Sequence, residues 1–195
     1  MNIKKIVKLV AIIGGGIIAI GGLTIGVTGY WPIAMVGYAP ITYNAFKENF
    51  MMADHFYRSN IKMTGEDERV MEARDIQRDI QRATMEGLVE QILIERELEQ
   101  RYKKDDLQRL IENKLTGIAL DSKDMQKGTE LLYGLTPEQF KELVLIPKAK
   151  QELLEGNLSL QNGSFNNWLT ERKKSARVSV FVPSLYWNGE EIQTR

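Results

Sequence analysis

Near its C-terminus the chain reads Val178-Ser179-Val180-Phe181-Val182-Pro183, in which valines alternate with other side chains after a long region of helical spacing. Alternation with a period of two predicts a β-strand. A lone strand would leave its backbone groups unpaired, and the only other candidate strand is residues 33–38, which we expect Pro40 to close. We therefore predict a small antiparallel pairing of these segments, which joins the two ends of a mostly α-helical domain.

The residues between the two strands show the apolar spacing of helices. Thr42 is expected to cap a helix over 43–58, followed by a loop over 59–65. Residues 66–102 contain no proline and no strong turn signal, so one long helix is the simplest prediction. Further helices are expected after Asp105 or Asp106, after Ser122 and over 165–174.

Thr136-Pro137-Glu138-Gln139 has the pattern of a capping box with proline at the first helical position, and predicts the start of another helix. Pro147 should kink or end that helix. Residues 156–164 are expected to form a polar loop before the last helix.

The N-terminal part of the chain is strongly apolar. No charged residue occurs between Lys8 and Lys47, and residues 9–27 are almost all apolar. About 20 apolar residues in a helix cross a membrane core of ~30 Å. We therefore expect a cytoplasmic basic tail at 1–8, a transmembrane helix over 9–31 and an extracytoplasmic domain beyond it in the cell membrane. A cleavable signal peptide is the alternative interpretation.

Small residues recur within the expected span at positions that share one helix face, where a second helix could approach. These helix-packing candidates are Gly15, Ala19, Gly22, Gly26 and Gly29. Glycine is common in membrane helices, so a chance arrangement is the alternative explanation. Tyr30 and Trp31 follow as expected interfacial anchors.

Composition excludes several kinds of function. The 195 residues include no cysteine and a single histidine, His55, which excludes disulfides, His/Cys zinc sites and Cys–His nucleophile pairs. No phosphate-binding or dinucleotide motif occurs in a suitable context. Net charge is zero, which gives no reason to expect nucleic acid as a partner. We expect neither catalysis nor a cofactor or metal.

The order of motifs resembles the N-terminal chaperone domain of SurA-like and PrsA-like extracytoplasmic folding factors, over residues 32–183. The resemblance is carried by the Val36–Thr42 segment followed by Phe46, by the segment Leu132–Lys141, and by Trp168-Leu169 leading into the strand at 176–182. Residues 184–195 would be a C-terminal tail, which either frays or forms a second hairpin.

The resemblance implies a chaperone or holdase that binds unfolded or exported polypeptides. Enzymatic members of the family carry a parvulin prolyl-isomerase domain before the closing strand, where this chain has only a short loop. The resemblance therefore implies a SurA-N-like module without prolyl-isomerase catalysis.

Binding unfolded clients favours flexible methionines and aromatic residues on an open surface. The candidates lie in or near the first two helices: Met51, Met52, Phe56, Met63 and Met71. Packing in the core is the alternative role for each of them. A different class of function is also open. In this alternative the chain is a structural or assembly partner, with a homodimer as one arrangement, that docks a dedicated envelope protein through its helices and glycine-striped anchor.

Overall fold

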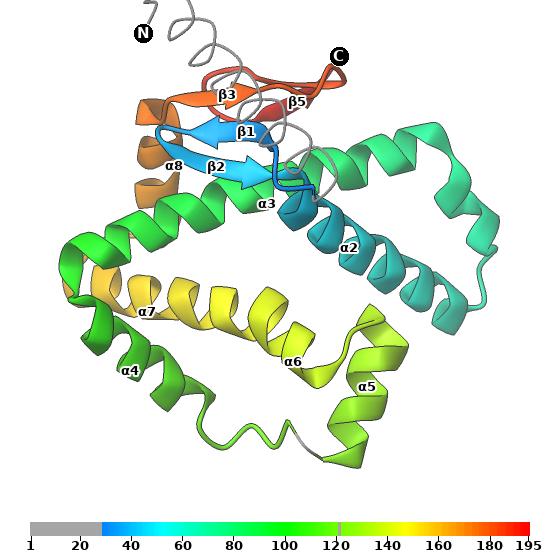
Figure 1. Ribbon diagram of the computed structural model, residues 1–195, viewed down its shortest axis with the longest axis horizontal. Coiled ribbons are helices and arrows are strands. Elements are labelled where there is room, and N and C mark those ends of the chain that lie inside the picture. Colours follow the sequence, from blue (N-terminus) through cyan, green and yellow to red (C-terminus); the bar gives the residue numbers. More distant parts are fainter. Residues whose placement is uncertain (1–28, 121) are drawn as a thin grey trace, which may run out of the picture.

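The computed structural model describes residues 29–120 and 122–195. Figure 1 shows a mainly helical fold in which small strands gather at one end of the molecule and most helices lie on the other side of α3 (Arg74–Arg101). Helix α3 is therefore the central helix of the domain. It packs against the strands with its middle and against the helical part with its C-terminal half.

A three-stranded antiparallel sheet in the order β2–β1–β3 ties the ends of the domain together. Strand β1 (Pro32–Val36) lies in the centre, with β2 (Ala39–Thr42) on one side and β3 (Val178–Val180) on the other. In the pairing of β1 with β3, Ala34 lies opposite Val180. The two segments expected to pair therefore do so, although Pro40 does not close a strand and instead pairs with Met35 inside β2.

The C-terminal residues form a second, two-stranded antiparallel sheet. Strand β4 (Leu185–Trp187) pairs with β5 (Ile192–Thr194), and Leu185 and Ile192 are almost fully buried. The tail expected at 184–195 is thus an ordered hairpin that covers the core. Its apolar side chains are held by the same cluster that contains Val36 and Met85.

The first helices form a long hairpin. Helix α2 (Tyr43–Thr64) begins where the Thr42 hydroxyl accepts the N–H of Ala45, as predicted. It continues through residues 59–64, where a loop was expected, and Gly65 caps its C-terminal end. The predicted helix over 66–102 is instead a 3-10 helix, η1 (Glu68–Glu72), and α3, because Ala73 has an extended backbone that breaks the helix between them.

The remaining helices follow α3 in the chain. They are α4 (Lys104–Leu115), α5 (Lys123–Tyr133), α6 (Pro137–Phe140), the π-helical turn η2 (Lys141–Leu145), α7 (Ile146–Leu160) and α8 (Phe165–Ser175). Both halves of the capping box at Thr136 and Gln139 are present, which confirms that prediction. Helix α7 extends to Leu160 and so occupies part of the expected loop.

Two apolar clusters hold the strands and helices α3, α4, α7 and α8 together. One joins the strands to the middle of α3, and the other joins the last turns of α3 to α4 and α7. Trp168 of α8 packs against both clusters. Burial of these side chains supplies the main driving force for the fold, at about 25 cal/mol per Å² of apolar surface.

The predicted fold class is wrong. Within residues 29–120 and 122–195, no helix combines the length and hydropathy that a membrane span requires. Most of the predicted span, together with Gly15, Ala19, Gly22 and Gly26, lies outside the described residues. The fold that the structure shows is a helical domain with two small antiparallel sheets.

The end of the predicted span has a different structure from the one expected. Gly29 has a φ of 72° and accepts the N–H of Asn44, so it lies in a turn and not on a helix face. The ring of Trp31 stacks on Tyr43 with centroids 4.8 Å apart, and therefore belongs to the folded domain.

Candidate polypeptide-binding groove

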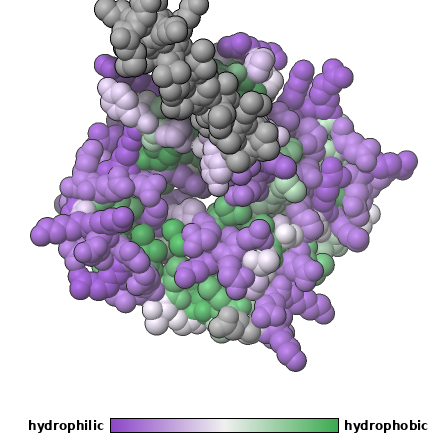
Figure 2. Space-filling model, in the orientation of Figure 1, coloured by the Kyte–Doolittle hydropathy of each residue, from purple (hydrophilic) through white to green (hydrophobic). Residues whose placement is uncertain are grey.

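A groove of about 670 Å³ lies where the last turns of α3, helix α4 and the η2–α7 segment meet. Its apolar lining comes from Tyr102, from Leu107, Ile111 and Leu115 of α4, and from Ile146 of α7. Figure 2 shows hydrophobic side chains gathered in the area that α4, α6 and α7 surround in Figure 1. The volume falls within the usual range of ligand sites, about 300–1,000 Å³.

The sequence of α4 explains why this helix presents an apolar wall. Leu107, Ile111 and Leu115 recur every four residues and therefore share one face. Asp105 and Asp106 lie in the first turn, where negative charge complements the helix dipole, and Lys114 lies in the last turn. The helix thus forms from local signals, and its apolar face is divided between the core and the groove.

Helix α7 runs antiparallel to α4 along the groove. Lys114 near the end of α4 bonds Glu152 at 3.2 Å, whereas Tyr102 before its start bonds Asn157 further along α7 at 2.8 Å. Consequently η2, which precedes α7, lies beyond the Leu115 end of the groove. The corner between α3 and α4 forms the other end.

A π-helical turn next to Pro147 shapes the wall opposite α4. The N–H of Ile146 donates to the Lys141 carbonyl, five residues back, where an α-helix would use the carbonyl four residues back. Proline has no N–H and its ring collides with the carbonyl four residues before it, which is Leu143 here. The wider turn accommodates both effects, so the helix continues past Pro147 instead of ending, and Ile146 lines the groove.

Polar residues form part of the rim and some of them pair with one another. Lys150 of α7 donates to Glu95 of α3 at 2.5 Å, which links the two helices across one side of the groove. Gln108 donates to Glu112 at 2.9 Å along α4. The site therefore combines an apolar floor with a charged edge.

The methionine and aromatic candidates of the first two helices lie in different surroundings. Met51 and Met63 of α2 are 57% and 61% exposed, but 12 residues separate them, so they lie on different faces of the helix. Neither lines a groove with the other.

Met52 and Phe56 face neighbouring helices. Met52 lines a smaller groove of about 220 Å³ between α2 and α3. The ring of Phe56 stacks on Tyr133 of α5 with centroids 5.1 Å apart, and Tyr133 packs in turn on Phe140. Phe56 therefore holds α2 against α5, and both Met52 and Phe56 remain half-buried.

Met71 is buried, with 2% of its surface exposed. It lies in η1, and its carbonyl accepts a hydrogen bond from Gln77. A side chain in this position fills the space beneath the turn between α2 and α3. Met71 is therefore a core residue, which is the alternative role expected for it.

Comparisons of this chain with known protein families, with characterised proteins and with solved structures found no match. The part of the chain that the structure describes also contains no group of three His, Cys, Asp or Glu side chains placed to hold a metal ion. The α3–α4–α7 groove is therefore assessed on its own geometry.

Sequence reasoning missed this groove although its signals were present. The stripe of Leu107, Ile111 and Leu115 indicates an amphipathic helix, and such a stripe normally packs entirely in a core. Pro147 indicated a kink or an end to the helix, which concealed the contribution of Ile146. Only the packing of α4 against α7 decides that one edge of the stripe stays open.

Proposed function

We propose that this chain is a polypeptide-binding module of the holdase type, which binds unfolded or exported polypeptides without isomerising their prolines. The observation that carries the proposal is the open groove with an apolar floor between α4 and α7. Apolar contacts are non-directional, so such a floor accepts side chains of different sequences. The resemblance to the SurA- and PrsA-like chaperone domain supports the same function and stays a prediction.

The proposal is tested by aggregation of two unrelated unfolded proteins in the presence of the full chain, kept in solution with a mild detergent because residues 9–27 are apolar. We expect light scattering of both proteins to fall at near-equimolar concentration. No suppression of either would contradict the proposal and favour a dedicated assembly partner. Turnover of a proline-containing peptide would contradict its non-catalytic part.

Variants locate the activity. Leu115→Glu places a charge among the apolar side chains of the groove and should reduce suppression, whereas Leu160→Glu on α7 should not, because Leu160 is 88% exposed and outside the groove. Gln108→Trp gives a second test from the exposed rim, since a large ring there fills the groove without adding a charge. Circular dichroism checks that each variant is folded.

A further inference from the structure

Charged residues without a partner lie at both ends of the groove. Glu99 and Lys104 flank the corner between α3 and α4, and Lys141 and Glu142 lie in η2 at the opposite end. None of the four side chains makes a hydrogen bond or ion pair with any residue in 29–120 or 122–195. Each end thus offers one free cation and one free anion.

The length of α4, which forms one wall of the groove, sets the length of an occupant. Helix α4 has 12 residues, so at a rise of 1.5 Å it extends for about 17 Å along the groove. An extended polypeptide advances about 3.3 Å per residue. A segment of about five extended residues therefore matches the full length of α4 along the groove.

We propose that the groove binds an extended apolar segment of about five residues flanked by charges of either sign, in either chain direction. This inference rests on the proposed function. A flanking cation meets Glu99 at one end or Glu142 at the other. A flanking anion meets Lys104 or Lys141 in the same way. Because both ends offer both charges, neither the sign of the flanks nor the direction of the segment is selected.

The test uses fluorescently labelled peptides and the full chain. Four peptides share one apolar five-residue core and carry Lys at both ends, Glu at both ends, or one of each in both orders, and a fifth has the core reversed. Exposed ion pairs contribute about 0.2–1 kcal/mol, so the dissociation constants should agree within about fivefold. A preference of about tenfold or more for one charge sign or one direction would overturn the proposal.

A charge reversal sharpens this test. Lys104→Glu leaves the corner with two anions, so binding of the Glu-flanked peptide should weaken and that of the Lys-flanked peptide should strengthen. Lys103→Glu is the matched control, because Lys103 is exposed, next in sequence and outside the groove lining. Equal effects of the two variants would count against the groove.

Photo-crosslinking from the peptide core shows where the peptides bind. We expect crosslinks in residues 102–115 and 141–150, and crosslinks confined to α2 would overturn the inference. If the chain suppresses aggregation but binds no peptide of this set, the inference fails and the proposed function stands. If it neither suppresses aggregation nor binds peptides, both fail.

Discussion

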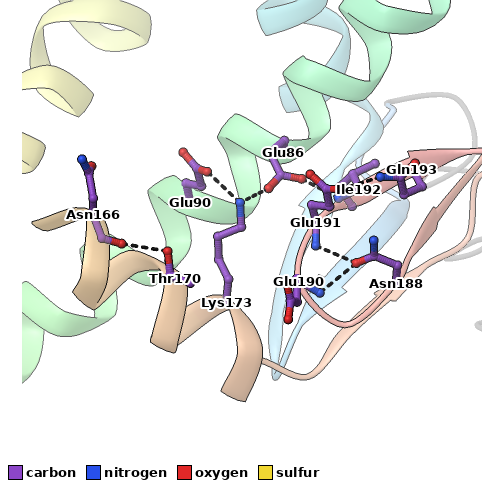
Figure 3. A network of polar contacts seen from close by, with 10 residues as sticks. All are labelled: Glu86, Glu90, Asn166, Thr170, Lys173, Asn188, Glu190, Glu191, Ile192 and Gln193. Atoms are coloured by element: carbon purple, nitrogen blue, oxygen red, sulfur yellow. Dashed lines mark hydrogen bonds and ion pairs between the residues drawn. The ribbon is translucent and has the colours of Figure 1, made fainter.

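Lys173 of α8 and Glu86 of α3 form an ion pair, and the same Glu86 carboxylate accepts the backbone N–H of Ile192 in β5 at 2.5 Å (Figure 3). Lys173 also donates to Glu90 at 3.1 Å. One carboxylate thus joins three elements that are far apart in sequence. Burial lowers the pKa of Lys173, but the two glutamates outweigh this effect and raise it above its ordinary value.

Glu86→Gln should destabilise the protein more than Glu90→Gln. Glu86 serves both the ammonium group and a backbone N–H, whereas Glu90 serves only the ammonium group. Hydrogen bonds to charged groups contribute about 1.5–3 kcal/mol, so we expect a loss of about 2 kcal/mol for Glu86→Gln and less for Glu90→Gln. Urea unfolding measures both, and equal losses would contradict the central role of Glu86.

Glu97 should make the stability of the α3–α8 contact dependent on pH. Burial raises the pKa of Glu97, but Arg101 and Arg172 outweigh burial and hold it below its ordinary value. The stabilisation is therefore present above the ordinary pKa of a glutamate, about 4.3, and is lost as pH falls through the lower folded pKa.

We expect Glu97→Gln to destabilise the protein at neutral pH by about 1–3 kcal/mol, because the charge-assisted bonds to Arg101 and to Arg172 weaken. The difference from the unsubstituted chain should shrink in acid, where Glu97 itself becomes neutral. Denaturant unfolding at several pH values below 5 tests this, and a difference that stays constant would exclude the linkage.

Gly134 should be less tolerant of a side chain than Gly65, although both end helices with a positive φ, 66° and 77°. A Cβ at Gly134 would lie 2.9 Å from Nδ1 of His55, whereas one at Gly65 would meet nothing within 4 Å. Gly65→Ala therefore carries only the cost of the left-handed backbone, about 1 kcal/mol. Gly134→Ala should cost more in thermal unfolding.

A double-mutant cycle isolates the contact with His55. In the His55→Ala background the collision is absent, so Gly134→Ala should then cost about as much as Gly65→Ala. His55→Ala alone also removes the bond between its Nε2 and the Leu131 carbonyl, which the cycle corrects for. Additive effects of the two substitutions would show that the contact carries no strain.

Met71→Ala should lower the free energy of unfolding by about 2–5 kcal/mol, because it leaves a cavity beneath η1. Met51→Ala should change it by no more than about 0.5 kcal/mol, since Met51 is exposed. Chemical denaturation of both variants makes the comparison. A small effect at Met71 would restore it as a candidate for client contact.

The sequence by itself determined the local features. Thr42 and Thr136 cap helices as predicted, and Ser122 caps the helix expected after it, because a hydroxyl needs only the N–H three residues later to form its bond. The helix expected after Asp105 or Asp106 begins earlier, at Lys104, without a side-chain cap. The alternation at 178–182 likewise located a strand, and the need to pair its backbone groups identified β1 as its neighbour. These are signals that act within a few residues or have a single possible partner.

Tertiary structure alone decided the rest. Residues 184–195 fold because Leu185 and Ile192 pack against residues of α3. Met71 is buried because η1 places it between α2 and α3. The groove exists because α4 and α7 meet along only part of their apolar faces. Burial depends on contacts between residues distant in sequence, and helical or strand spacing shows which face is apolar but not how much of it a neighbour will cover.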